Sequence, residues 1–466
     1  MTRVGIVAIG GDNPIRVQSM TTTNTNDTLA CVEQAKRIID AGGELVRLTT
    51  QGRREAENLR NIRVELHRQG YQTPLVADVH FNANVADVAA HYAEKVRINP
   101  GNYVDPARTF KHLEYTDEEY ADELTKIEER LQPFIAICKE HHTAVRIGVN
   151  HGSLSDRIMS RYGDTPDGIV ESCMEFLRIF RKYDFNDIVI SIKASNTVVM
   201  VQSVRLLVQQ MDKEDMHYPL HLGVTEAGEG EDGRIKSAVG IGALLTEGIG
   251  DTIRVSLSEE PEAEIPVARK LVAMIDECTA LRQQAEAGIQ DDTIILTLPA
   301  DSEPTDYSDA SELSEEVKLK AAMAVGALLI DRKATKLIIR DLNPRSSLVA
   351  PQKYTDLADA ILQAARIKFT KTEYISCPGC GRTLYDLRTT IARIKEATRD
   401  LVGLKIGIMG CIVNGPGEMA DADYGYVGAG PGRISLYRQK ECVEKNIPEA
   451  EAVDHLLALI RADRES

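Results

Sequence analysis

The chain contains no long apolar run, and its acidic residues outnumber its basic ones. No apolar stretch reaches the roughly 18 residues that a membrane-spanning helix needs, so no membrane anchor is expected. There are 71 Asp and Glu residues against 55 Lys and Arg, which gives a formal net charge of −16. Such a surface repels nucleic acid and anionic membranes, so neither is an expected partner. An anionic substrate would need a local cluster of basic residues.

Sequence signatures of export and of several enzyme classes are also missing. The N-terminal segment 1–20 lacks the basic, apolar and small-residue regions of a signal peptide, and it leads at once into strand-like sequence. No signal or transit peptide is therefore expected, and the predicted location is the cytoplasm. The chain has no HExxH or Ser-His-Asp pattern. Its glycine clusters at 9–14 and 227–233 do not match a dinucleotide-binding or P-loop fingerprint.

The 466 residues predict more than one domain, because single hydrophobic cores stop growing at roughly 250–300 residues. Residues 1–285 alternate short Val/Ile/Leu-rich runs with amphipathic stretches, which is typical of parallel strands separated by helices. Eight such units predict an α/β fold, a (β/α)8 TIM-type barrel of typical length. The predicted strands are 14–20, 44–50, 73–79, 94–99, 143–149, 187–194, 218–224 and 251–257.

The remaining sequence divides into two further segments. Residues 286–365 predict a small α/β insertion, with helices at 317–330 and 355–366 and a strand at 335–342. Its acidic stretch 299–316, which contains Ser and Pro, predicts a flexible loop. Residues 366–466 combine a Cys-x-x-Cys turn with helices and a Gly-rich turn, which predicts a compact α+β domain.

Cysteines carry the strongest chemical signal in the C-terminal segment. Cys377 and Cys380 lie on the turn CPGCG, and Cys411 follows a predicted strand in GCIVNGPGE. Three converging thiolates suit an iron–sulfur cluster, which prefers soft ligands. A structural zinc site, with Cys442 as a fourth ligand, and a redox dithiol remain alternatives. The other cysteines lie in helix-like apolar patterns and are expected to be small buried hydrophobes: Cys31, Cys138, Cys173 and Cys278.

Glu418 closes the turn NGPGE, whose glycines and proline define a tight backbone path. A carboxylate is a hard ligand and matches a cluster iron poorly. An iron held by Glu418 could therefore exchange it for a substrate oxygen. The alternative is an exposed loop glutamate without a role.

Basic residues recur inside the predicted barrel strands, where burial on both faces makes them costly. One of them could form a structural ion pair with Asp78 or Glu226. Five at one barrel mouth predict a phosphate cage, because active sites of this fold lie at the carboxyl ends of the strands. The five are Arg47, Arg97, Arg146, Lys193 and Arg254. Polar residues that follow these strands and could orient a substrate are Asn99, Asn150, Asn196 and Thr225.

Long motifs across the barrel and the C-terminal segment resemble the 4-hydroxy-3-methylbut-2-en-1-yl diphosphate synthase family of isoprenoid biosynthesis. The resemblance is carried by VQSMTTT, VRINPGN, RIGVNHGSL, IKASN, HLGVTEAGEGEDGRIKSAVGIG, IGDTIRVSL, CPGCGRTLYDL and GCIVNGPGEMADADYGYVG. It implies a [4Fe–4S] cluster held by Cys377, Cys380, Cys411 and Glu418. It also implies an oxidoreductase that opens 2-C-methyl-D-erythritol 2,4-cyclodiphosphate by a two-electron reduction with loss of water.

The resemblance assigns further positions and partners. The residues implied to bind the diphosphate are Arg47, Arg97, Arg146, Asn150, Lys193, Thr225, Arg254 and Ser256. The polar neighbours implied to assist catalysis, together with Glu418, are Asp78, Glu226 and Asn414. Ferredoxin or flavodoxin is the implied electron donor.

The segment 286–365 departs from the family pattern. The motifs are those of the family's long form, but the middle insertion is reduced. In the short form the two halves of a site come from different subunits, so a homodimer is expected here. Two other functions remain alternatives: a zinc-stabilised TIM-barrel binding protein, and a pterin-dependent transferase, whose barrel also binds diphosphates but needs no cluster motif.

Overall fold

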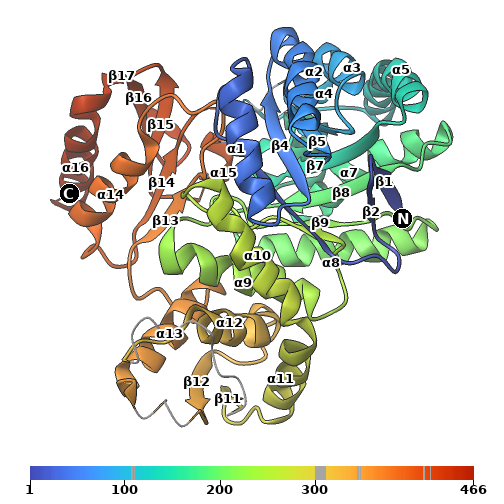
Figure 1. Cartoon of the computed structure of the whole chain (residues 1–466). Coiled ribbons are helices and arrows are strands. Elements are labelled where there is room, and N and C mark those ends of the chain that lie inside the picture. The colour runs from blue at the N-terminus through green and yellow to red at the C-terminus, as the bar shows by residue number, and fades with distance from the viewer. Residues whose placement is uncertain are drawn as a thin grey trace.

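The computed structural model describes residues 1–106, 109, 111–299, 311–343, 346, 348–412, 415–419 and 421–465. In this part of the chain, parallel strands form an eight-stranded sheet in the order β8-β7-β6-β5-β4-β3-β10-β9, and a bridge between Ile190 and Leu220 joins its two edges. The sheet is therefore the predicted TIM-type barrel (Figure 1). Its strands are β3 (Arg16–Met20), β4 (Leu45–Thr50), β5 (Leu75–Val79), β6 (Lys95–Ile98), β7 (Ala144–Asn150), β8 (Ile188–Lys193), β9 (His221–Leu222) and β10 (Thr252–Ile253).

Helices between the strands surround the barrel. Several begin where a side chain accepts a hydrogen bond from a free backbone N–H group of the first turn, as Asp27 does from Ala30 and Thr165 from Gly168. The helices are α1 (Thr28–Asp40), α2 (Arg53–Arg68), α3 (Ala83–Ala90), α4 (Pro100–Tyr103), α5 (Asp117–His141), η1 (His151–Ser153), α6 (Asp156–Tyr162), α7 (Pro166–Lys182), α8 (Thr197–Lys213), α9 (Gly230–Leu245), η2 (Pro261–Ala263) and α10 (Glu264–Ala273).

An N-terminal hairpin of β1 (Thr2–Val4) and β2 (Val7–Ile9) packs against the amino-terminal ends of the strands. It buries Val4 and Ile9 in one apolar cluster with residues at or near the start of four strands, namely Leu45, Val76, Ala144 and Val189. The hairpin therefore covers this end of the barrel. The opposite, carboxyl-terminal end is where barrels of this type bind ligands.

The middle segment packs against the barrel. After α11 (Ile275–Ala287), which crosses the predicted boundary between residues 285 and 286, it contains β11 (Thr293–Leu298), α12 (Glu315–Ile330), β12 (Lys336–Asp341) and α13 (Pro351–Ala364). The parallel strand β11 was not predicted. Gly326 of α12 lets its backbone lie against α9, since a Cβ there would meet the Val239 carbonyl oxygen at 2.6 Å. Most of the predicted flexible loop, 300–310, lies outside the described residues.

The C-terminal domain combines a mixed sheet with helices, as the predicted α+β class requires. The sheet order is β13 (Glu373–Ser376), β14 (Lys405–Met409), β15 (Tyr424–Gly430), β16 (Arg433–Arg438) and β17 (Glu441–Pro448). The antiparallel strands β15 to β17 were not predicted, whereas α14 (Leu387–Thr398) and α16 (Glu449–Glu465) were. None of the described helices is long and apolar enough to cross a membrane.

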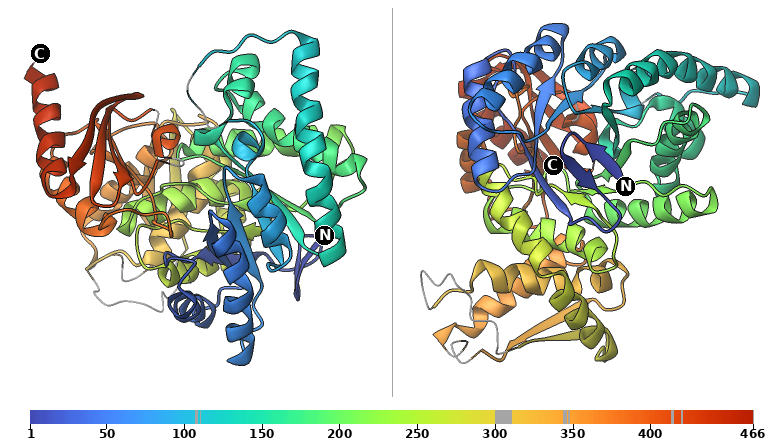
Figure 2. Two further views of the ribbon diagram at one scale, coloured as in Figure 1. Left: turned by 90° about the horizontal axis from the view of Figure 1, so that it is seen from above. Right: turned by 45° about the vertical axis from the view of Figure 1, so that its right-hand side comes forward.

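The C-terminal domain lies against the barrel of the same chain (Figures 1 and 2). Its short helix α15 (Gly415–Glu418) contacts η1 so closely that a Cβ on Gly417 would lie 1.5 Å from the Gly152 carbonyl oxygen. A parallel bridge joins Ala227 to Ser376 at the end of β13. The Ser258 hydroxyl donates a 2.9 Å hydrogen bond to the Cys377 carbonyl oxygen. The carboxyl end of the barrel therefore faces the cysteine-bearing turns.

Candidate active site

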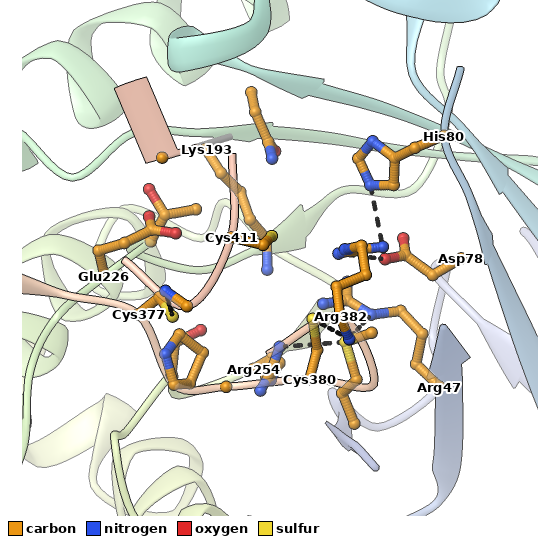
Figure 3. Close-up of a pocket in the computed structure, with 18 of the residues that line it drawn as sticks. Arg47, Asp78, His80, Lys193, Glu226, Arg254, Cys377, Cys380, Arg382 and Cys411 are labelled. Atoms are coloured by element: carbon orange, nitrogen blue, oxygen red, sulfur yellow. Dashed lines mark hydrogen bonds and ion pairs between the residues drawn. The ribbon is translucent and has the colours of Figure 1, made fainter. Parts of the chain in front are cut away.

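A cavity of about 90 Å³ lies between the carboxyl end of the barrel and the C-terminal domain (Figure 3). Most of the predicted site residues line it, from both parts of the chain. They are Arg47, Asp78, Arg97, Arg146, Asn150, Lys193, Thr225, Glu226, Arg254, Ser256, Cys377, Cys380 and Cys411. Predicted phosphate-binding residues and predicted cluster ligands therefore share one cavity.

Strand register places the cationic residues on the interior of the barrel. Asp78 on β5 stands opposite Arg97 on β6, and Arg97 stands opposite Arg146 on β7. Opposed residues of parallel strands point to the same face of a sheet, so all three side chains point inward. Asn150 and Lys193 form a second opposed pair nearer the carboxyl ends of β7 and β8.

Asp78 is the acidic centre of this cationic group. Its carboxylate lies 3.1 Å from Arg97 Nη1 and 3.5 Å from His80 Nε2. Burial raises its pKa, but Arg47, Arg97 and His80 outweigh that effect and hold the pKa of Asp78 well below its ordinary value. Burial, and then Arg97, lower the pKa of His80 to about 3. The ring is therefore neutral at pH 7 and can accept the hydrogen bond from Arg97.

Arg254 has its own internal partner, whereas Arg146 does not. Both Nε and Nη2 of Arg254 donate to the Glu264 carboxylate, at 2.9 and 3.0 Å. Arg146 is only 1% exposed, and its Nε and Nη1 have no hydrogen-bond partner within the described structure. Leaving buried charged donors unpaired is costly, so this part of the cavity is complementary to an anion.

Glu226 contributes a carboxyl group with different properties. It is buried, one of its oxygens lacks a hydrogen-bond partner among the described residues, and its backbone is left-handed with φ +49°. Burial raises the pKa of Glu226, although Thr225 and nearby lysines oppose the shift. Glu226 is therefore suited to holding a proton beside the cationic group.

The three predicted cluster cysteines form no disulfide with one another and line the cavity. The backbone N–H of Gly410 donates to Cys377 Sγ at 3.2 Å, and that of Arg382 donates to Cys380 Sγ at 3.5 Å. Amide donors of this kind stabilise metal-bound thiolates. Where the structure describes the chain, no three His, Cys, Asp or Glu side chains come close enough to hold a single metal ion.

The remaining cysteines have no part in this site. Cys442 lies on β17, at the far edge of the sheet from β13, and it does not line the cavity. The zinc alternative therefore lacks the fourth ligand suggested for it. The other four are buried, as predicted: Cys31, Cys138, Cys173 and Cys278.

Glu418 is buried, so the alternative of an exposed loop glutamate is wrong. It is 2% exposed, and its carboxylate accepts hydrogen bonds from the Thr225 hydroxyl at 2.9 Å and the Gly152 N–H at 3.4 Å. Burial, followed by Glu226, raises its pKa well above the ordinary value. The Glu418 carboxylate is not part of the cavity lining. Asn414 lies outside the described residues.

Two titratable residues of the cavity were missed in the sequence. His80 follows β5, two positions after Asp78, and Arg382 follows directly after CPGCG. Their sequence positions close to Asp78 and Cys380 could have identified them as candidate site residues. Conversely, Asn99 and Asn196 cap α4 and α8, where they accept hydrogen bonds from backbone N–H groups. Neither lines the cavity, and their role in orienting a substrate stays a prediction.

Two family models match the chain: the GcpE TIM-barrel domain over residues 1–269, and the GcpE protein C-terminal domain over residues 373–462. A Phocaeicola vulgatus protein named 4-hydroxy-3-methylbut-2-en-1-yl diphosphate synthase (flavodoxin) is 52% identical over 597 residues, covering 99% of this chain and 97% of that protein. A Bacteroides fragilis protein of the same name is 52% identical over 596 residues, covering 99% and 95%.

A third protein of that name, from Akkermansia muciniphila, is 41% identical over 562 residues, covering 98% of this chain and 95% of its own. These alignments are longer than the 466 residues of this chain, so the relatives contain residues that have no counterpart here. The segment between the two family models is where the sequence predicts a reduced insertion. The chain belongs to the GcpE family, the 4-hydroxy-3-methylbut-2-en-1-yl diphosphate synthases.

Proposed function

We propose that this chain is an oxidoreductase that reduces 2-C-methyl-D-erythritol 2,4-cyclodiphosphate to 4-hydroxy-3-methylbut-2-enyl diphosphate. The observation that carries the proposal is the shared cavity, in which barrel cations face three cysteines of the C-terminal domain. Neither alternative function accounts for this pairing. A pterin-dependent transferase has no use for the cysteines, and a zinc-stabilised binding protein needs a closed set of four ligands.

The barrel residues would bind and orient the diphosphate. Arg146 offers two N–H groups without partners, and Lys193 reaches the same cavity from the end of β8. Arginine can bind a phosphate through two parallel hydrogen bonds, which fixes its orientation as well as its position. Arg97 is held by Asp78 and by the Gly148 carbonyl oxygen, so its guanidinium is already oriented before substrate arrives.

Cys377, Cys380 and Cys411 would hold a [4Fe–4S] cluster. Their number, their softness as ligands and the amide donors on two of the sulfurs all fit such a group. When bound, the cluster would supply the two electrons of the reaction one at a time. Glu418, as the fourth ligand, stays a prediction, because its carboxylate is bonded to Thr225 and Gly152.

Formation of water from a substrate hydroxyl requires a proton at the leaving oxygen. Glu226 lines the cavity, and burial raises the pKa of its carboxyl group, which favours a bound proton relative to an exposed glutamate. We assign it the role of proton donor to that oxygen. Asp78, which stays ionised, would instead hold the arginine side chains in place.

The relatives are named for flavodoxin, so we propose flavodoxin as the electron donor. We also propose the cytoplasm as the location. Both halves of the cavity come from one chain, so a second subunit is not needed to complete it. A homodimer stays a prediction that a sedimentation measurement would test.

Anaerobic purification of two cysteine variants tests the proposal. Wild-type protein should be brown and contain iron and sulfide. Cys411→Ser should lose most of the iron, because it removes a ligand, whereas Cys442→Ser should retain it, since Cys442 lies outside the cavity. A colourless wild-type protein that contains one zinc ion, or equal iron in both variants, would contradict the proposal.

A further inference from the structure

Arg382 brings a guanidinium of the C-terminal domain into the cavity, next to the barrel residues. Its side chain is 8% exposed and lines the cavity, and its Nη2 lies 3.5 Å from Asp78 Oδ2 (Figure 3). Its Nε and Nη1 are buried and have no hydrogen-bond partner within the described part of the chain. Buried N–H groups of a charged side chain are costly to leave unpaired, so an acceptor is missing on this side of Arg382.

Asp78 faces Nη2 of Arg382 and does not bond to Nε or Nη1. Its carboxylate already lies 3.1 Å from Arg97 and 3.5 Å from His80, and Arg47 is close enough to lower its pKa. Of the other acids near the cavity, Glu264 is used by Arg254 through both oxygens. The Cys380 and Cys411 thiols also lie beside Arg382 and interact with it, and Glu226 lines the same cavity, yet Nε and Nη1 of Arg382 have no hydrogen-bond partner among the described residues. A molecule that enters the cavity and carries several negative oxygens would supply acceptors for both.

Arg146 also has two N–H groups without a hydrogen-bond partner among the described residues. These groups belong to the barrel, whereas those of Arg382 belong to the C-terminal domain. Both side chains line one cavity of about 90 Å³. A diphosphate, with oxygens on two phosphorus atoms, can accept hydrogen bonds from both.

We infer that Arg382 binds the diphosphate of the substrate from the C-terminal domain, so that the bound substrate links the two domains. The inference rests on the proposed function and adds to it a substrate-binding residue outside the barrel.

Equilibrium binding of the cyclic diphosphate to the anaerobic, cluster-containing protein tests this inference. Arg382→Gln should bind it about 10- to 100-fold more weakly, because charge-assisted hydrogen bonds are lost. Arg382→Lys should be intermediate, since lysine keeps the charge but not the planar fork. Iron content should be unchanged.

Arg388→Ala is the matched control. Arg388 also reaches from the C-terminal domain to the barrel, where it contacts Glu260 and the Glu259 carbonyl oxygen, but it is exposed and outside the cavity. Its replacement should leave substrate affinity at the wild-type value. Substrate should also raise the thermal unfolding midpoint of this variant as much as that of wild type, and raise that of Arg382→Gln less.

Wild-type affinity in Arg382→Gln would overturn the inference. If Arg382→Gln fails to retain iron, the affinity of Arg382→Lys is the deciding measurement. Wild-type affinity in Arg382→Lys would then overturn the inference. Arg146→Ala separates this failure from failure of the proposed function. If Arg146→Ala loses substrate binding and the Arg382 variants do not, only the role of Arg382 is rejected. If the wild-type protein does not bind the substrate, the proposed function itself is rejected.

Discussion

The Thr225 hydroxyl of the barrel donates a 2.9 Å hydrogen bond to the Glu418 carboxylate of the C-terminal domain. The second carboxylate oxygen accepts the Gly152 N–H at 3.4 Å, and the Ser195 hydroxyl donates to the Glu418 carbonyl oxygen at 2.9 Å. A single glutamate therefore contacts the barrel through its side chain and its backbone. The contact is buried, so each of these hydrogen bonds is shielded from competition by water.

Replacement of Glu418 by Gln should reduce turnover at least tenfold while iron content is retained. The amide oxygen can accept only one of the two hydrogen bonds, and the carboxylate charge is lost. Iron and sulfide analysis with steady-state kinetics would measure both effects. Asp421→Asn is a suitable control, because Asp421 is on the same loop but is half exposed and pairs with Arg366. Full activity of Glu418→Gln would show that its carboxylate is not required.

Gly417→Ala should separate α15 from η1 and reduce turnover on the order of 100-fold, since small displacements of reacting groups are costly. A Cβ at this position would lie 1.5 Å from the Gly152 carbonyl oxygen, so the two backbones must move apart. Small-angle scattering should detect a larger radius of gyration.

The control for this change is Gly52→Ala. A Cβ on Gly52 would meet nothing within 4 Å, and its backbone is extended, with φ −138°. It should leave turnover and the radius of gyration unchanged. If Gly417→Ala kept the turnover of the wild-type protein, close contact of α15 with the barrel would not be needed for activity.

Arg146→Met should stabilise the substrate-free protein by about 1–3 kcal/mol, because it removes a buried charge without a partner. The same change should lower affinity for the cyclic diphosphate about 100-fold. Urea unfolding and equilibrium binding measure the two effects.

Arg157→Met provides the opposite case. Arg157 is equally buried but is paired with Glu175 at 2.8 Å and Asp105 at 3.1 Å. Its replacement leaves two buried carboxylates without their counter-charge and should destabilise the protein by about 3–5 kcal/mol. If both variants shifted stability in the same direction, the assignment of Arg146 as an unpaired cation would be refuted.

His80 should make the protein less stable as the pH falls below about 6.5, the pKa of an unfolded histidine. Its folded-state pKa is about 3, so between these values the unfolded chain binds the extra proton and the native state loses stability. The contribution is fully present above pH 6.5 and declines by about 1.4 kcal/mol for each pH unit below it.

Urea unfolding of His80→Gln between pH 7 and pH 5 checks this expectation, because the variant should show a shallower decline than wild type. His217→Gln is the control, since His217 is exposed, beside Asp212 and Asp215. Parallel pH profiles of His80→Gln and wild type would contradict a neutral, buried imidazole.

The barrel and the membership of its site could largely be predicted from the sequence. All eight predicted strands correspond to observed ones, because strands buried on both faces are continuous apolar runs between helical stretches. The basic residues stood out for the same reason, since a charge inside such a strand is costly. CPGCG and GCIVNGPGE are local signals too, because the first places two thiols three residues apart and the second flanks Cys411 with a Gly-rich turn that ends at Glu418.

Only the tertiary structure decided which of these charges are paired and which are free. Arg254 pairs with Glu264 and Arg146 with no described residue, although both looked alike in their strands. The burial of Glu418 depends on Thr225, 193 residues away, and Arg382 reaches Asp78 across the domain boundary. Hydrogen bonds and ion pairs depend on distances of a few ångströms between segments that the fold brings together. A local pattern cannot specify those distances, whereas it can specify which strand a residue occupies and which face it points to.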